Sequence, residues 1–124
     1  MQNLSEKISD SELEVMRVLW EAGDALPITD IRQILHDRKG WEATTVKTLV
    51  QRLVGKGVLE QEKRKVFYYR PLVSESEYSD WAVSGMVQRL FRGSAKALVA
   101  TLVKSDGLSE EDLAELRDFF KVED

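Results

Sequence analysis

Apolar residues recur at helical spacing in three successive stretches of the first half of the chain. The first stretch covers residues 9–22. Ser9 or Asp10 is suited to cap it, Glu12 stands where a capping box needs an acidic residue, and Gly23 is suited to end it. This stretch therefore predicts a short amphipathic helix.

The second and third stretches have the same character. The second opens with Pro27, which suits a first helical turn, and ends at Lys39. The third runs from Glu42 or Ala43 to Lys56. Its apolar positions, spaced i, i+3, i+4 and i+7, are Val46, Leu49, Val50, Leu53 and the flanking Val54.

The periodicity then changes from helical to strand-like. Residues 58–62 and 66–72 predict two strands, the second rich in aromatic side chains, joined by the basic tip Lys63-Arg64-Lys65. The segment 55–57, Gly-Lys-Gly, is too short for a phosphate-binding loop and predicts a helix end and turn. Three helices followed by a hairpin is the element order of a winged helix-turn-helix, whose third helix enters the DNA major groove.

Residues 74–124 are helical by pattern. Ser74 or Ser76 can cap a helix that stops near Gly93, residues 95–104 form a second helix, and Ser109 opens a third. Such short helices cannot build a good core alone, so we expect two copies to interlock as a homodimer. The residues expected between the copies are Trp81, Leu90, Phe91, Leu98, Leu102, Leu113, Leu116, Phe119 and Phe120.

The fold expected from these patterns is mainly α with a small β-hairpin. It comprises a winged-helix DNA-binding domain over residues 1–73 and a helical dimerisation domain of three helices over residues 74–124.

The net charge of −4 argues at first against a nucleic-acid partner. The charge is not evenly spread, however. Residues 32–70 carry ten basic and four acidic residues, a net of +6, between two flanking segments that each carry −5. Such an asymmetry is compatible with an ordinary solvated surface or with a docking face, and the positions of the basic residues favour the docking face.

The polar side of the third predicted helix carries hydroxyl, amide and basic groups and no acidic residue. These groups contact bases and phosphates in DNA-binding helices. We expect base contacts from the first turns, by Thr44, Thr45, Lys47 and Thr48. We expect contacts to the DNA backbone from Gln51, Arg52, Lys63, Arg64 and Lys65. Two plainer interpretations remain: the threonines cap the helix, and the basic tip is a solubilising turn.

The sequence offers little for catalysis. It has no cysteine and a single histidine, His36, and no nucleophile, phosphate-loop or dinucleotide-binding motif. We therefore expect that the protein is not an enzyme and that it has no metal site and no cofactor. Trp20 and Trp41 are expected to be core residues. No apolar run approaches 18 residues and no signal segment is visible, so we expect a cytoplasmic protein without membrane insertion.

Several of these runs together resemble the BlaI/MecI/CopY family of bacterial repressors. They are SELEVMRVLW, TTVKTLVQRL, YYRPLV and, in the tail, FRGSAKALVATLV and LSEEDLAELRDFF. The resemblance implies a homodimeric winged-helix repressor that binds a pseudo-palindromic double-stranded operator and controls a stress or resistance operon. The alternative is a winged-helix module that binds proteins without specific DNA binding.

The resemblance also implies how repression ends. In the antibiotic-resistance branch a membrane sensor-protease leads to cleavage of the repressor, and by alignment the cleavage site falls at Thr101-Leu102. The family's usual residues at these two positions are Asn and Phe, whereas this chain has Thr and Leu there. The copper branch uses Cys-x-Cys motifs, and none lies within these 124 residues.

Overall fold

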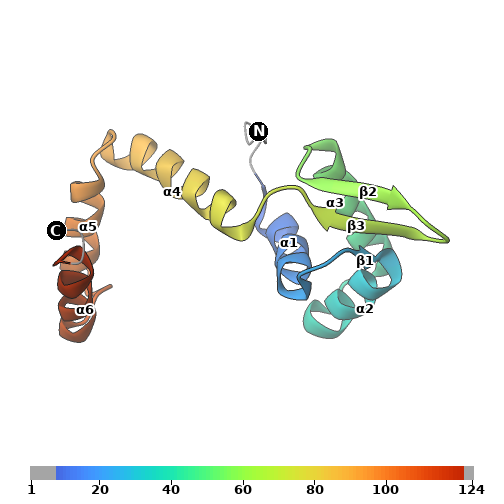
Figure 1. Ribbon diagram of the computed structural model, residues 1–124, viewed down its shortest axis with the longest axis horizontal. Coiled ribbons are helices and arrows are strands. Elements are labelled where there is room, and N and C mark those ends of the chain that lie inside the picture. Colours follow the sequence, from blue (N-terminus) through green and yellow to red (C-terminus); the bar gives the residue numbers. More distant parts are fainter. Residues whose placement is uncertain (1–7, 122–124) are drawn as a thin grey trace. The chain divides into compact units, whose positions relative to one another are not determined.

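A computed structural model describes residues 8–121 of the chain. The elements, in chain order, are α1 (Asp10–Ala22), β1 (Leu26–Pro27), α2 (Ile28–Lys39), α3 (Ala43–Gly55), β2 (Leu59–Lys63), β3 (Phe67–Pro71), α4 (Glu75–Phe91), α5 (Ala95–Lys104) and α6 (Glu110–Lys121) (Figure 1). The chain divides into two compact units between Trp81 and Ala82, within α4. We call them the N-terminal and the C-terminal unit. The assignment of residues 1–73 and 74–124 to separate domains stays a prediction.

Capping side chains set the starts of several helices, among them α1 and α4. The Glu12 amide donates to Ser9 Oγ at 3.1 Å, and the Ser9 amide donates to Glu12 Oε1 at 2.9 Å. The predicted capping box of α1 is therefore confirmed, with Ser9 rather than Asp10 as the cap. Ser74 and Glu77 form the same reciprocal pair at the start of α4, so Ser74 rather than Ser76 caps that helix.

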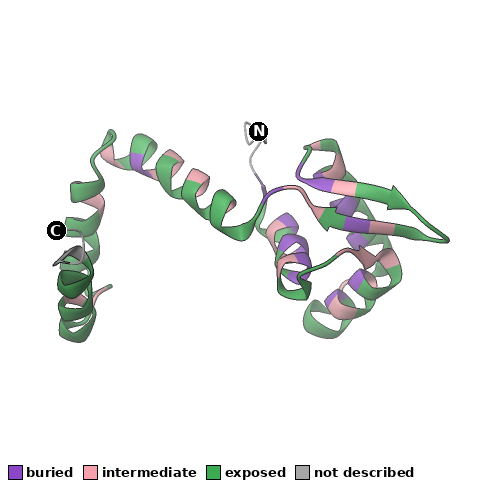
Figure 2. Cartoon of the chain, in the orientation of Figure 1, coloured by how far each residue is buried: buried purple, intermediate pink, exposed green. Residues whose placement is uncertain are grey.

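The core lies in the N-terminal unit, where α1, α2 and α3 pack together (Figure 2). The predicted apolar stripe of α3 is buried there, against Val15, Met16 and Leu19 of α1 and Ile31 and Leu35 of α2. Trp20 and Trp41 are half-buried against this core, as the sequence predicted. Burying one face of α3 leaves its other face at the surface.

The sheet has three strands in the order β1-β3-β2, all antiparallel. The sequence predicted only the hairpin of β2 and β3. It missed β1, a pairing of Leu26 with Tyr69 and of Pro27 with Tyr68, because two residues are too few to show a strand period. Pro27 is extended, with ψ of 154°, and caps α2, so its predicted place in the first helical turn is wrong by one residue.

The hairpin also differs from the prediction at its tip. Lys63 lies in β2 opposite Phe67, so the turn covers residues 64–66 rather than 63–65. Lys63 thereby belongs to one face of the sheet, whereas Arg64 and Lys65 belong to the turn.

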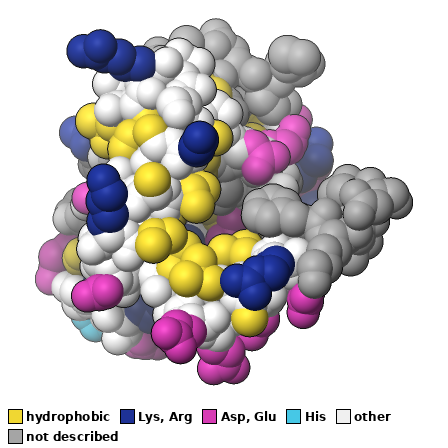
Figure 3. All heavy atoms as spheres, turned by 90° about the vertical axis from the view of Figure 1, so that its left-hand side faces the viewer, with side chains coloured by type: hydrophobic (Ala, Val, Ile, Leu, Met, Phe, Trp, Pro, Cys, Tyr) yellow, Lys and Arg dark blue, Asp and Glu magenta, His cyan; other side chains and the backbone are white. Residues whose placement is uncertain are grey.

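The C-terminal unit is very different in burial. Among the described side chains of residues 82–119, Val87 is the only buried one. Figure 3, which looks at the chain from the side of α5 and α6, shows hydrophobic side chains gathered at the surface. Across residues 8–121, no helix is long and apolar enough to cross a membrane.

Candidate nucleic-acid interface

The exposed face of α3 carries the six residues that the sequence predicted for DNA contact in this helix. All are exposed: Thr44, Thr45, Lys47, Thr48, Gln51 and Arg52. The residue that caps α3 is Glu42, and its side chain makes no capping hydrogen bond. Thr44 and Thr45 lie inside the helix, so the interpretation that they cap it is wrong. Their side chains are available at the surface in the first turn, where helix-turn-helix proteins contact bases.

The charge of this face is uncompensated. Helix α3 contains no acidic residue, and within the part of the chain that the structure describes neither Lys47 nor Arg52 enters an ion pair. Several other cations of the N-terminal unit are paired, as Arg38 is with Glu21 at 2.8 Å. Unpaired basic side chains on one helix face give a local positive potential, which attracts phosphate groups.

We call the hairpin of β2 and β3 the wing. Some of its basic side chains form ion pairs and others do not. Arg64 Nε lies 2.6 Å from Glu62 Oε1, and its guanidinium stands 4.2 Å from the centre of the Tyr68 ring. The hydrogen bond to Glu62 raises the pKa of Arg64 above its ordinary value. Lys63 and Lys65 are exposed and form no ion pair with any described residue.

Tyr69 joins the wing to α3. Its ring is buried in the core to which the apolar side of α3 also belongs, and its hydroxyl donates to Gln61 Oε1 at 3.2 Å. Burial raises the pKa of Tyr69, while the charge of Arg32 and the side chain of Gln51 act in the opposite direction. Gln51, predicted to contact the DNA backbone, thus also influences the pKa of a residue of the wing.

Sequence reasoning missed Arg32, which lies on α2. It lines a shallow groove of about 400 Å³ between α2 and the start of α3, and its Nε has no hydrogen-bond partner within the described part of the chain. The signal was present, because Arg32 is the first residue of the basic segment. The apolar periodicity of α2 does not distinguish Arg32 from an ordinary solvated side chain.

The sequence model of the penicillinase repressors matches residues 8–121. The chain belongs to this family. It is 32% identical over 111 residues to the penicillinase repressor of Bacillus licheniformis, a match that spans 89% of this chain and 86% of that protein. It is 32% identical over 118 residues to the methicillin resistance regulatory protein MecI of Staphylococcus aureus strain N315, spanning 94% of this chain and 95% of that one. The predicted resemblance is confirmed, and the family is one of repressors.

Two solved structures of BlaI are similar to a large part of this chain. The solution structure of the DNA-binding domain of BlaI is 35% identical, spans 63% of this chain and 94% of that one, and has a TM-score of 0.55. The monomeric form of B. licheniformis BlaI in complex with the blaP half-operator has the same identity and coverage and a TM-score of 0.54. The predicted winged-helix fold is thereby confirmed.

The predicted cleavage site lies in the C-terminal unit, in α5. Thr101 and Leu102, the predicted cleavage site, lie inside α5 and are exposed, and Thr101 Oγ1 donates to the Ala97 carbonyl at 2.9 Å. His36 is exposed. Across residues 8–121, no group of three or more metal-ligating side chains gathers in one place.

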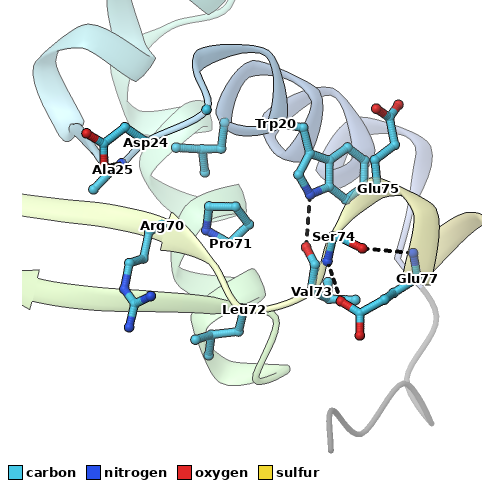
Figure 4. Close-up of a pocket in the computed structure, with 12 residues that line it drawn as sticks. Trp20, Asp24, Ala25, Arg70, Pro71, Leu72, Val73, Ser74, Glu75 and Glu77 are labelled. Atoms are coloured by element: carbon cyan, nitrogen blue, oxygen red, sulfur yellow. Dashed lines mark hydrogen bonds between the residues drawn. The ribbon is translucent and has the colours of Figure 1, made fainter.

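A cavity of about 580 Å³ lies away from α3, where α1 ends and α4 begins (Figure 4). Polar groups on its wall are already used within the fold. Trp20 Nε1 donates to the Val73 carbonyl at 2.9 Å, and Ser74 is engaged in the cap of α4. Tyr78 stacks between Trp20 and Trp81, at 6.1 and 5.8 Å between ring centroids. These contacts hold the first turns of α4 against α1, and they give Trp81, predicted for the dimer interface, a partner in its own chain.

Proposed function

We propose that this chain is a dimeric, sequence-specific DNA-binding repressor of the bacterial cytoplasm that recognises a pseudo-palindromic operator and blocks transcription of a stress or resistance operon. The observation that carries the proposal is the exposed face of α3, which combines hydroxyl groups in its first turns with unpaired cations and no acidic residue. The half-operator complex of BlaI supports DNA as the partner.

The chemistry of the α3 face fits the major groove. A Thr side chain can contact a thymine methyl through its own methyl group, while Lys47 can donate to guanine acceptors. Arg52 stands further along the helix, where the helix leaves the bases and a phosphate contact is expected. Lys63 and Lys65 of the wing, and Arg32 beside the start of α3, add positive charge for the DNA backbone.

A homodimer explains the surface of the C-terminal unit. Large apolar side chains at the surface there are Val83, Leu90, Val99, Leu102, Val103, Leu116 and Phe119. The predicted interface residues Phe91, Leu98 and Leu113 are half-buried, and the side chain of Phe120 lies outside the described residues. A unit with so little buried apolar area gains its core by pairing with a second copy.

Relief of repression through a membrane sensor-protease and cleavage at Thr101-Leu102 is part of the proposal. Because that bond lies inside α5, the helix must unwind before a protease can bind an extended backbone there. The second candidate function is a protein-interaction module whose basic face meets an acidic partner, and the experiment below separates the two.

The test begins with selection from a random pool of 30-base-pair duplexes by the full-length protein. We expect enrichment of a two-fold symmetric sequence, and then tight binding of that duplex in a fluorescence anisotropy titration. Lys47→Ala should weaken this binding about 10- to 100-fold, because a good base contact by a basic side chain contributes about 1–3 kcal/mol.

The matched control is Lys96→Ala, which removes the same charge from an exposed site on α5. It should leave the affinity within about twofold of wild type. If no sequence is enriched and the wild type binds no duplex at low salt, the proposed repressor function is refuted and the protein-interaction function is favoured. Equal weakening by the two variants would show that Lys47 acts only through net charge.

A further inference from the structure

The wing has two chemically distinct faces. Side chains alternate across a strand, and residues directly opposite in an antiparallel pair share a face. The register places Gln61 opposite Tyr69 and Lys63 opposite Phe67, and we call this set the inner face. The alternate set, the outer face, consists of Glu60, Glu62, Tyr68 and Arg70.

The outer face is neutralised by its own ion pairs. Arg70 Nε lies 2.6 Å from Glu60 Oε1, directly across the two strands. Arg64, from the turn, pairs with Glu62 and lies over the Tyr68 ring, so its charge is also directed to this face. A phosphate approaching this face would meet two carboxylates already engaged with the two guanidinium groups.

The inner face is continuous with α3. Tyr69 is buried in the same core as Val50 and Leu53 of α3, so this face of the wing is the one directed toward that helix. Beyond Tyr69 the face ends in Phe67, whose side chain is 39% exposed, and in the exposed Lys63. Across the described residues Lys63 forms no ion pair, so the end of the inner face carries an uncompensated charge beside an exposed aromatic ring.

We propose that Lys63 and Phe67, on the inner face, hold the sugar-phosphate backbone of the operator beside the groove that α3 enters, and that Arg64 does not take part. The inference rests on the proposed function. Lys63 supplies the charge for a phosphate, and the Phe67 ring covers the adjacent deoxyribose and removes its own apolar surface from water. Lys63 and Arg64, neighbours in the basic run, thus have different roles, decided by the face to which each side chain is directed.

The test measures affinity for the selected duplex at a series of KCl concentrations. Each phosphate contact contributes about 0.9 to the slope of log affinity against log salt. Lys63→Gln should therefore reduce the slope by about 0.9 per bound subunit, while Arg64→Gln, the same loss of charge one residue away, should leave the slope unchanged. Phe67→Ser should weaken binding about fivefold with an unchanged slope, and Tyr68→Ser, its outer-face counterpart, should bind as wild type.

Two outcomes overturn the inference: equal loss of slope in Lys63→Gln and Arg64→Gln, or wild-type affinity in Phe67→Ser. Thermal unfolding by circular dichroism identifies any variant that fails to fold. The comparison of Lys63→Gln with Arg64→Gln tests the inference even if one of the aromatic variants does not fold. Absence of binding by the wild type would refute the proposed function instead, since the slopes are compared only in proteins that bind.

Discussion

At the scale of single residues, one buried side chain outside the proposed DNA-binding face links α1 to the end of α3. Glu12 is 2% exposed and accepts a hydrogen bond from Lys56 Nζ at 2.6 Å, while its carboxylate also caps α1 through the Ser9 amide. It thus joins the start of α1 to the residue that ends α3. Burial alone would raise the pKa of Glu12, but the bonds from Lys56 and Ser9 outweigh it, and the pKa lies below the ordinary 4.5.

Glu12→Gln should lower the free energy of unfolding at pH 7 by about 2 kcal/mol, because the variant loses a buried charge-assisted pair. A group with a lowered folded pKa contributes stability above its unfolded pKa, and this contribution is lost as the pH falls through the folded pKa. The wild type should therefore lose stability below pH 4.5, and the variant should lose less over the same range. Urea unfolding at pH values from 7 to about 3 measures both effects.

The control is Glu14→Gln, on the same helix. Glu14 pairs with the exposed Arg17 at 2.8 Å, and surface pairs of this kind contribute at most about 1 kcal/mol. A loss of stability as large as that of Glu12→Gln would show that burial of the Glu12 carboxylate is not the cause.

At the scale of elements, the sequence predicts a helix reliably where apolar residues recur over several turns. The apolar positions of α3 recur four times, and the caps at Ser9 and Gly23 follow from residue type, so both were predictable. Strand β1 was not, since two residues show no period and its pairing with β3 is a tertiary event. The different roles of Lys63 and Arg64 were equally hidden, because they depend on hairpin register and on partners across the strands.

The Tyr69 hydroxyl forms a bridge across the wing by donating to Gln61 Oε1 at 3.2 Å, while the Tyr69 ring is packed in the core with α3, and we expect this bridge to help place the wing against that helix. Tyr69→Phe keeps the ring in the core and removes only this bridge. We expect a loss of about 1 kcal/mol in unfolding free energy and a several-fold weaker affinity for the selected duplex. Tyr68→Phe, whose ring lies on the outer face, should change the affinity less than twofold. Equal affinities of the two variants would contradict a role for the bridge in positioning the wing.

At the scale of the whole molecule, we expect the basic segment and the C-terminal unit to act together in binding a symmetric operator. The net charge of +6 over residues 32–70 is confined to α2, α3 and the wing, and the acidic flanks keep the chain's overall charge negative. A single unit with this footprint can hold half of a symmetric operator. Binding the second half as part of the same event requires the second copy, which the surface of the C-terminal unit is expected to provide.

Leu90→Asp tests this coupling. Leu90 lies on α4 and is 65% exposed, so the single chain does not need its side chain for folding, whereas an apolar dimer interface does. In sedimentation velocity the wild type should be a dimer and the variant a monomer at micromolar concentration. Affinity for the full symmetric duplex should fall about 100-fold or more, because linking two half-sites raises avidity by 10²–10⁴.

A matched control variant and a duplex with a single half-site separate loss of the dimer from loss of DNA binding by one subunit. Gln88→Asp introduces the same charge on the same helix at an exposed polar position, and it should remain dimeric. Affinity for a duplex that carries one half-site should be equal in wild type and Leu90→Asp, since α3 and the wing are unchanged. A Leu90→Asp protein that stays dimeric would place the interface elsewhere, and one that loses half-site affinity would show that the substitution reaches the N-terminal unit.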